Sequence, residues 1–405
     1  MAESVRTITG GITAPPGFRA GSTSCGIKSE AGSKDLALLI SDQPCVTAAT
    51  FTTSRTPAAP VLLCKEYLTA TGNRAQAVIV NSGNANCSTG EQGMKDARQM
   101  STSVGTQYQI NPQLVLVSST GIIGRPMPMD LIEKGIPQIT PTADGGDNFS
   151  QSIMTTDTRS KQIAVEFEIG DKTIRMGGTT KGAGMIYPNM ATMLCYITTD
   201  AAVDPAWLQN RLRAAVMDSF NMICVDGDMS TNDSVIVMAN GSAGNVPLKS
   251  GAPGADTFTL ALNQVTRYLA IEIARDGEGM TKLMEVRVRN AADAGDARKA
   301  ARSVTLSPLW QCALGGGDAN WGRIVAALGA SGVRFEHNQL GIAFGNVQVV
   351  QHGIATNYQQ DDVTAVMAQP EVVITVDLNQ GSAFATAWGC DLTHGYIDEN
   401  TNYHR

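Results

Sequence analysis

The sequence lacks the features of a chain that binds nucleic acid or spans a membrane. Its 30 Lys and Arg residues form no basic run, and the formal net charge is −7, so we expect no nucleic-acid partner. No apolar stretch approaches the roughly 20 residues needed to cross a membrane. The first residues, "MAESVRTITGG", lack the basic and apolar regions of a signal peptide. We therefore expect a cytoplasmic protein without membrane contact.

Cysteine and histidine are also poorly placed for catalytic or metal sites. The eight cysteines include no CxxC pair, which favours reduced, mostly buried thiols over disulfides or zinc ligation. The four histidines lie apart from one another and from any candidate nucleophile in sequence. A Ser-His-Asp triad or a histidine-bound metal would therefore depend on contacts made only in the folded chain. Neither a Walker A sequence nor a complete GxGxxG is present, so a nucleotide cofactor has no support.

The acidic segment 226–233, "DGDMSTND", superficially resembles a calcium-binding loop. In such a loop a glycine makes the sharp turn and a glutamate binds the ion with both oxygens. Thr231 stands in the place of the glycine and Val237 in the place of the glutamate. We therefore predict a network of turns here and no metal.

The composition and patterning favour a layered α/β fold. With 405 residues, 43% of them apolar and 17% charged, the chain can form two lobes or one large α/β unit. Short β-branched runs, such as those at 77–81 and 284–289, predict strands. Amphipathic stripes predict helices that begin near Asp204 and Asp256. Helices that alternate with pairs of strands are typical of layered α/β proteins rather than helical bundles.

One segment, Thr179–Asp200, has an unusual composition. It reads "TTKGAGMIYPNMATMLCYITTD" and combines a lysine, small residues, a Pro-Asn pair and a threonine just before an apolar run. A Gly-rich loop entering a strand would account for it. Alternatively, the threonine is a nucleophile. A free α-amine, with a pKa of about 7.7–8.0, can take the proton from the hydroxyl of the same residue, provided that the preceding peptide bond is cut.

This segment closely resembles the KG(S/A)GMI-x-PNMATML signature of the bifunctional ornithine acetyltransferase / glutamate N-acetyltransferase family. Seven further stretches resemble the family in the expected order. They are "GGITAPPGFRAG" (10–21), "VNSGNANCSTGEQG" (80–93), "SSTGIIG" (118–124), "VDGDMSTND" (225–233), "ARDGEGMTK" (274–282), "GGDANWGR" (316–323) and "AWGCDLTHGYIDENTNY" (387–403).

The resemblance implies that the precursor cleaves itself between Ala191 and Thr192. The products would be an α fragment, 1–191, which carries the oxyanion-hole loop, and a β fragment, 192–405, which begins with the nucleophile Thr192. In the family's ping-pong mechanism, the threonine Oγ attacks the acetyl carbonyl of N-acetylornithine and ornithine leaves. The amine of glutamate then attacks the acetyl-threonine ester. This exchange needs no cofactor.

The resemblance also assigns roles to individual residues. Thr120 and Gly121 match the pair that stabilises the oxyanion, although from sequence alone they would be an ordinary turn at the end of a strand. Lys181 suits a substrate carboxylate and Glu278 suits the ammonium of ornithine, whereas from sequence alone both would be solvated surface charges. The full set of implied substrate contacts is Thr155, Lys181, Thr192, Glu278 and Asn400.

Two positions depart from the family pattern or invite another assignment. Many family members end in Thr or Ser five residues after the asparagine that matches Asn400, whereas this chain has Arg405 there. Its guanidinium offers an alternative contact for a substrate carboxylate. Cys195, three residues after Thr192, is not expected to be the nucleophile, because apolar neighbours raise the pKa of a thiol.

The family fold is an α/β (α+β) sandwich of αββα type that resembles N-terminal-nucleophile enzymes, with the α and β fragments interleaved. Family members assemble as α2β2 heterotetramers. Three alternatives stay open at this point. The chain could also accept acetyl-CoA as the acetyl donor and act as an N-acetylglutamate synthase. It could instead be an amidase or peptidase of related fold, or a binding protein that is never cleaved.

Overall fold

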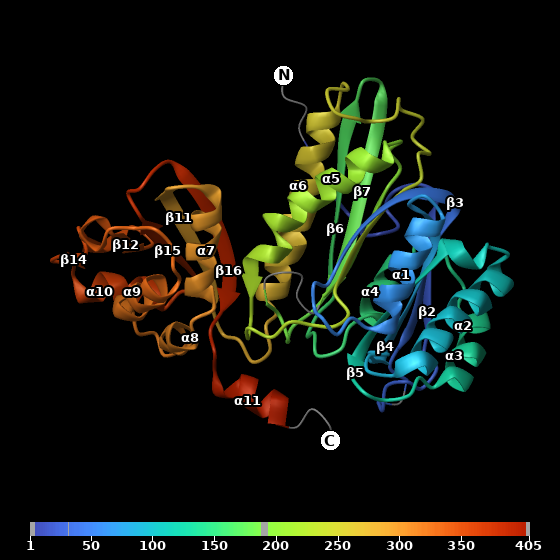
Figure 1. Cartoon of the computed structure of the whole chain (residues 1–405), viewed down its shortest axis with the longest axis horizontal. Helices are drawn as coiled ribbons and strands as arrows, with labels where there is room; N and C mark the ends of the chain where they lie inside the picture. The colour runs from blue at the N-terminus through green and yellow to red at the C-terminus, as the bar shows by residue number, and fades with distance from the viewer. Residues whose placement is uncertain (1–4, 31, 188–192, 402–405) are drawn as a thin grey trace. The chain divides into compact units, whose positions relative to one another are not determined.

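The computed structural model describes residues 5–30, 32–187 and 193–401, which divide into two compact units. Unit 1 comprises Met1–Gly182, Asn189–Val216 and Met229–Leu269, and unit 2 comprises Ala183–Pro188, Met217–Asp228 and Ala270–Arg405. Each unit is built on one β-sheet with helices packed against it (Figure 1). The expected layered α/β fold with two sheets is confirmed.

The sheet of unit 1 is mixed and interleaves the two expected fragments. Its described strands follow the order β1-β6-β7-β8-β10-β3-β4-β5, and β2 pairs with β3. Strands β8 and β10 come from the expected β fragment and lie between β7 and β3 of the expected α fragment. The strands are β1 (Arg6–Ile8), β2 (Phe18–Thr23), β3 (Leu36–Phe51), β4 (Arg74–Asn84), β5 (Val115–Ile122), β6 (Lys161–Ile169), β7 (Lys172–Lys181), β8 (Leu194–Thr199) and β10 (Ser234–Ala239).

Helices cover both faces of this sheet. On one face, the Phe149 ring of α4 packs against Tyr196 of β8, with ring centroids 5.4 Å apart. On the other, Leu269 of α6 lies against Gly178 of β7, beside Ile197. Tyr196 and Ile197 are consecutive in β8, so their side chains point to opposite faces. The described helices between residues 59 and 274 are α1 (Ala59–Ala70), α2 (Gly90–Tyr108), η1 (Pro112–Leu114), α3 (Met129–Gly135), η2 (Ile136–Gln138), α4 (Gly146–Ser152), α5 (Pro205–Met217), α6 (Ala255–Ala274) and, in unit 2, η3 (Phe220–Met222).

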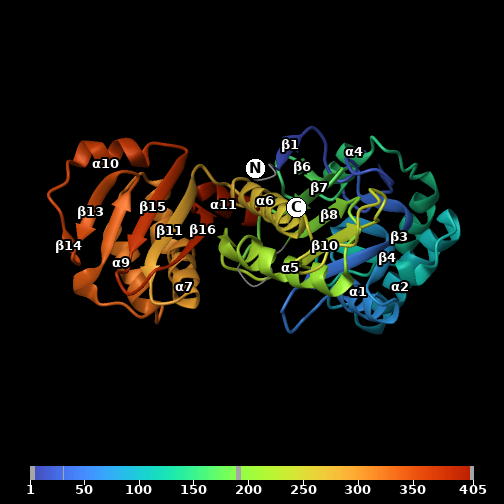
Figure 2. The same ribbon diagram turned by 90° about the horizontal axis from the view of Figure 1, so that it is seen from above.

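The sheet of unit 2 has the order β14-β13-β12-β15-β11-β16-β9, and α7 packs along β11 and β16 (Figures 1 and 2). Strand β11 runs antiparallel to β16 but parallel to β15. The elements are β9 (Ile223–Cys224), β11 (Leu283–Ala291), α7 (Ala294–Thr305), α8 (Pro308–Gly315), α9 (Trp321–Ala330), η4 (His337–Gln339), β12 (Gly341–Phe344), β13 (Val347–Gln351), β14 (Ile354–Ala355), α10 (Gln360–Met367), β15 (Glu371–Asp377), β16 (Ala383–Cys390) and α11 (His394–Thr401).

The clearest sequence signals correspond to real elements. The Asp204 carboxylate accepts the Trp207 N–H at 2.8 Å and so caps α5 at its predicted start. The second predicted helix is α6, whose apolar stripe is buried. The runs at 77–81 and 284–289 lie within β4 and β11. The expected cleavage point, Ala191–Thr192, and Arg405 lie outside the described residues.

Candidate active site

Strand β5 delivers Thr120 and Gly121 to the end of the unit 1 sheet. It pairs in parallel with β4, which aligns Thr120 with Ser82 and Gly121 with Gly83. Gly121 has a φ of +130°, and a Cβ there would lie 2.5 Å from the Asn84 nitrogen and 2.7 Å from the Gly83 Cα. Only glycine allows this conformation and this close approach of two backbones. Thr120 is 4% exposed at this position.

Lys181, the last residue of β7, connects Thr120 with Thr155. Its Nζ donates to the Thr155 hydroxyl at 2.7 Å and to the Thr120 hydroxyl at 3.4 Å. The lysine is only 2% exposed, so it is not the solvated surface charge that local sequence alone indicates. Three predicted site residues from separate segments of unit 1 therefore lie together, with Thr120 and Lys181 buried and Thr155 half-buried.

A residue that sequence reasoning missed, Asp157, organises this cluster. One carboxylate oxygen accepts hydrogen bonds from Lys161 Nζ and from the Gly182 N–H, both at 2.6 Å. The other accepts the Thr155 N–H at 3.0 Å and lies 3.9 Å from Lys181 Nζ. The side chains of Asp157 and Lys161 are fully buried.

The charges of the cluster determine what it can bind. Burial acts to raise the pKa of Asp157, but the nearby positive charges of Lys181 and Lys161 and the Gly182 N–H outweigh it and lower this pKa to about 2. One carboxylate thus faces two lysines. Such a buried site suits an anionic group, and a carboxylate is the simplest candidate.

The segment that follows the expected nucleophile is fixed at its first described residue, Met193, directly before β8. The Met193 N–H donates to Asp233 Oδ1 at 3.0 Å, and the Met193 carbonyl accepts the Ser234 N–H at 3.1 Å. Asp233 is fully buried, and this burial raises the pKa of its carboxyl well above the ordinary value. Asp233 was not predicted as a site residue either.

Unit 2 brings the other two described site residues together. The Asn400 side-chain amide donates to Glu278 Oε2 at 2.9 Å. The Glu278 N–H donates to the Ala183 carbonyl at 3.0 Å. The Glu278 carboxylate packs directly against Gly184. A Cβ at that position would overlap the carboxylate atoms, so the contact requires glycine. Glu278 is half-buried and Asn400 is exposed.

The segment that resembles a calcium loop is a network of turns. The Asp226 carboxylate accepts the backbone N–H groups of Met185 at 2.6 Å, Ile186 at 2.9 Å and Asp228 at 3.1 Å. Burial raises the pKa of Asp226. Within the described ranges, no group of three or more His, Cys, Asp or Glu side chains is arranged to hold a metal ion.

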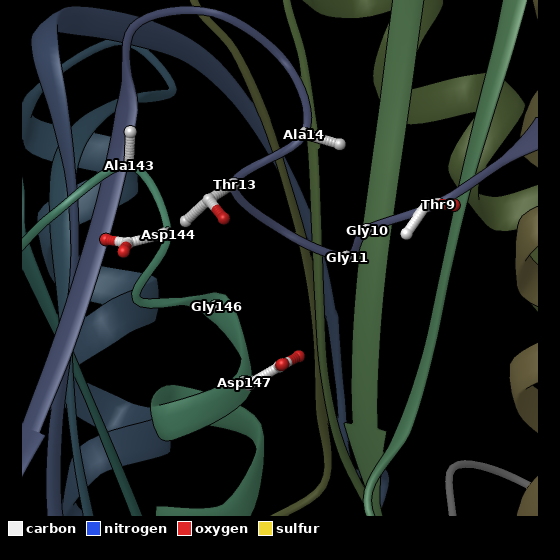
Figure 3. Close-up of a pocket in the computed structure, with 9 residues that line it drawn as sticks. All are labelled: Thr9, Gly10, Gly11, Thr13, Ala14, Ala143, Asp144, Gly146 and Asp147. Atoms are coloured by element: carbon white, nitrogen blue, oxygen red, sulfur yellow. The ribbon is translucent and has the colours of Figure 1, made fainter.

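One open pocket of about 220 Å³ lies elsewhere in unit 1 (Figure 3). Its lining is mostly small residues, and Asp144 and Asp147 supply its only ionisable side chains. None of the predicted site residues lines it. The lining residues are Thr9, Gly10, Gly11, Thr13, Ala14, Ala143, Asp144, Gly146 and Asp147.

Comparison with known proteins identifies the family of this chain. The family model described as "ArgJ family" matches residues 19–405. The chain belongs to the ArgJ family. It is 49% identical over 399 residues to the "Arginine biosynthesis bifunctional protein ArgJ" of Symbiobacterium thermophilum, which covers 98% of this chain and 99% of that protein. The protein of the same name from Oceanobacillus iheyensis is 45% identical, over 97% of this chain and 96% of its own.

A solved structure agrees with this assignment. The crystal structure of an ArgJ protein from Bacillus halodurans matches with 42% identity and a TM-score of 0.50, over 51% of this chain and 98% of that chain. The resemblance identified from the sequence motifs is therefore confirmed at the level of the family. Among the described helices of this ArgJ-family chain, none is long and apolar enough to cross a membrane.

The cysteines of this ArgJ-family chain are mostly buried. All eight are free, and six are buried. Cys195, the one nearest to Thr192, is fully buried, and burial raises the pKa of its thiol well above the ordinary value. A thiol in this environment is inert toward acyl groups, because the reactive species is the thiolate.

Proposed function

We propose that this chain is an acyltransferase of arginine biosynthesis that moves an acetyl group from N2-acetyl-L-ornithine to L-glutamate through Thr192. The observation that carries the proposal is the cluster of Thr120, Thr155 and Lys181 at the end of the sheet that also contains β8. Strand β8 begins two residues after Thr192. The relatives of nearly equal length, named as bifunctional proteins of arginine biosynthesis, support the pathway.

Thr120 is suited to stabilise negative charge. The Lys181 ammonium can only donate hydrogen bonds, so in their contact the Thr120 oxygen is the acceptor. The hydroxyl hydrogen of Thr120 is then available for another acceptor, such as the oxyanion of a tetrahedral intermediate. The Gly121 N–H is the second proposed donor.

The proposed reaction has two halves. After cleavage between Ala191 and Thr192, the α-amine takes the proton of the Thr192 hydroxyl, and the Oγ forms a bond to the acetyl carbon of N-acetylornithine. The amide C–N bond then breaks, and ornithine leaves with the proton as a free amine. In the second half, the amine of glutamate attacks the acetyl ester, the C–O bond breaks, and the proton returns to Thr192. No cofactor is consumed.

Opposite charges are proposed to hold the two amino-acid substrates. The Lys181 ammonium suits the substrate carboxylate, and Thr155 adds a hydroxyl beside it. Glu278 suits the ammonium of ornithine, and the Asn400 amide holds the Glu278 carboxylate in place. Arg405 is a further proposed carboxylate ligand.

The chain length of the solved relative supports cleavage. A cut before Thr192 would divide this chain into pieces of 191 and 214 residues, each about half of the whole. The Bacillus halodurans chain is itself covered almost completely by 51% of this chain. Two interleaved pieces per protomer also fit the α2β2 assembly proposed for the processed enzyme.

Replacing Thr192 by Ala tests the proposal. The variant should run as one full-length band on a denaturing gel and transfer no acetyl group from N-acetylornithine to glutamate. Thr192→Ser keeps a hydroxyl and should give two bands and measurable transfer. A Thr192→Ala protein that is cleaved and active would contradict the assignment of the nucleophile.

A second activity is proposed because the relatives are named bifunctional. Acetyl-CoA would then serve as an alternative acetyl donor to glutamate, at the same Thr192. The test supplies wild-type protein with glutamate and one donor, either N-acetylornithine or acetyl-CoA, and looks for acetylated glutamate. A parallel reaction with N-acetylornithine and water alone measures amidase activity. Release of acetate without glutamate as the main reaction would favour the amidase.

A further inference from the structure

The four residues Ser230–Asp233, which we name the STND loop, lie at the end of the unit 1 sheet and are all buried. The loop leads directly into β10, which pairs in parallel with β8 and antiparallel with β3. The Thr52 N–H donates to the Asp233 carbonyl at 3.0 Å, and the Thr52 hydroxyl donates to the Ser230 carbonyl at 2.7 Å. The loop is thereby fixed to the central strands.

Asn232 joins this loop to the strand that carries the proposed oxyanion donors. Its side-chain amide donates one hydrogen bond to the Ser119 carbonyl at 2.8 Å and another to the Ala85 carbonyl at 2.7 Å. Its side-chain oxygen accepts the Thr231 hydroxyl at 2.6 Å. Ser119 is covalently bonded to Thr120, so Asn232 fixes the backbone immediately before the proposed donor.

Asp233 joins the same loop to the segment between the proposed nucleophile and β8. Its Oδ1 accepts the Met193 N–H. The Met193 nitrogen is bonded to the carbonyl carbon of Thr192. The contact therefore lies two covalent bonds from the Cα of the proposed nucleophile. The other oxygen of Asp233 is buried and has no hydrogen-bond partner in the described residues.

We propose that Asn232 and Asp233 are positioning residues that set the separation between the nucleophile and the oxyanion donors. Asn232 acts through Ser119, and Asp233 acts through Met193. The inference rests on the proposed function, because it takes Thr192 and Thr120 as the reacting groups. Because Asn232 and Asp233 are consecutive residues of one short buried loop, they link the two segments rigidly. Rigidity matters here, since a displacement of about 1 Å at a catalytic group can lower a rate about 10²-fold.

The experiment compares Asn232→Ala with Asn245→Ala in the processed enzyme. Asn245 is a matched control, because it too is a buried asparagine of unit 1 and exchanges hydrogen bonds with the backbone of Ala202. Both variants should lose similar thermal stability. Only Asn232→Ala should lower kcat for acetyl transfer, by about 10–10²-fold, with KM for N-acetylornithine changed less than about 3-fold.

Asp233 is tested by two replacements. Asp233→Asn keeps an oxygen that accepts the Met193 N–H and should retain kcat within a few-fold, whereas Asp233→Ala should lose as much as Asn232→Ala. If the Asn232→Ala precursor is cleaved too slowly to give processed enzyme, the rate of processing is the readout, and the Asn245→Ala control should be cleaved at the wild-type rate. Should Asn232→Ala fail to fold, Asn232→Ser, which retains one donor, replaces it.

Intact-mass measurement of the β fragment after exposure to N-acetylornithine separates the possible failures. Wild-type enzyme that never gains an acetyl group would overturn the proposed function. Wild-type enzyme that is acetylated, together with an Asn232→Ala variant that is cleaved and acetylated at the wild-type rate, would overturn the positioning role alone. An equal loss of kcat in Asn245→Ala would also overturn it, because the effect would then be one of general stability.

Discussion

The buried carboxylate of Asp157 offers a direct test of how the site is held together. The Asp157→Asn substitution keeps the size of the side chain and removes its negative charge. The wild-type carboxylate accepts three hydrogen bonds, from Lys161, Gly182 and Thr155, and lies 3.9 Å from Lys181 Nζ. The substitution leaves both lysines without this counter-charge in a buried part of unit 1.

The expected cost follows from burial and from the count of acceptors. Removing one partner of a fully buried ion pair costs about 3–5 kcal/mol, because an ammonium is left uncompensated. Both oxygens of Asp157 accept hydrogen bonds, whereas an asparagine side chain has only one oxygen. Its NH2 group would therefore face a donor, either the Thr155 N–H or the pair of Lys161 Nζ and Gly182 N–H. These two effects concern the same contacts and are not added. We expect the free energy of unfolding to fall by about 3–5 kcal/mol.

The same contacts predict the pH dependence. The folded pKa of Asp157, about 2, lies below the ordinary value of 3.8. A carboxyl with a depressed folded pKa stabilises the fold above its unfolded pKa and loses this contribution as the pH falls through its folded pKa. The difference between wild type and Asp157→Asn should therefore be constant from about pH 5 to pH 8 and shrink between about pH 4 and pH 2.

Urea unfolding followed by circular dichroism and by tryptophan fluorescence measures this difference, and two probes are needed because the chain has two compact units. Asp171→Asn is the control. Its side chain is 87% exposed and pairs with Lys172 at 3.5 Å, so it should change stability by less than about 0.5 kcal/mol. Replacing Lys161 by Met together with Asp157→Asn should recover part of the loss. A single Asp157→Asn variant within about 1 kcal/mol of wild type would refute the reasoning.

Three further predictions concern single positions in unit 1. Thr120→Val keeps the shape but removes the hydroxyl, and should lower turnover by about 10²–10³-fold with KM little changed in steady-state assays; unchanged turnover would move the donor role elsewhere. Gly121→Ala should destabilise far more than Gly124→Ala in thermal melts, because both have positive φ but only Gly121 faces backbone within 4 Å, and an equal effect would contradict the crowding argument. Burial raises the pKa of Asp200 to about 6, so this carboxyl destabilises the fold as the pH rises from about 4 to 6. Asp200→Asn should therefore be more stable than wild type at pH 8 by about 1–2 kcal/mol, with no advantage below pH 4.

Local patterning predicted the elements whose signals lie within one segment. The cap at Asp204 and the apolar stripe of α6 are examples, since both arise from residues a few positions apart. Strand β3 shows where such reasoning ends. Its apolar run at 36–40 predicts a short strand, yet the strand continues to Phe51 through residues 41–44, which are Ser, Asp, Gln and Pro. β2 pairs with its first half and β10 with its second, and the register with β4 shifts between the halves. Pairing with distant strands overrides the local polar signal.

The candidate site was predictable only in part, for the same reason. The motifs named Thr120, Lys181 and Glu278, but from local sequence alone the two charged residues belong on the surface. Lys181 is buried because Asp157 and Thr155, more than twenty residues earlier in the chain, surround it. No local pattern marks Asp157 as its counter-charge, since the pairing is created by the return of β7 beside β6.

The backbone on either side of the expected cut is held by three separate buried or half-buried carboxyl groups. Asp157 accepts the Gly182 N–H, Asp226 accepts the N–H groups of residues 185 and 186, and Asp233 accepts the Met193 N–H. None of these contacts passes through residues 188–192. Cleavage between residues 191 and 192 therefore breaks one covalent link without removing any of these hydrogen bonds. Since β8 also remains paired with β7 and β10, the interleaved fragments need no covalent connection at this point to keep the sheet intact.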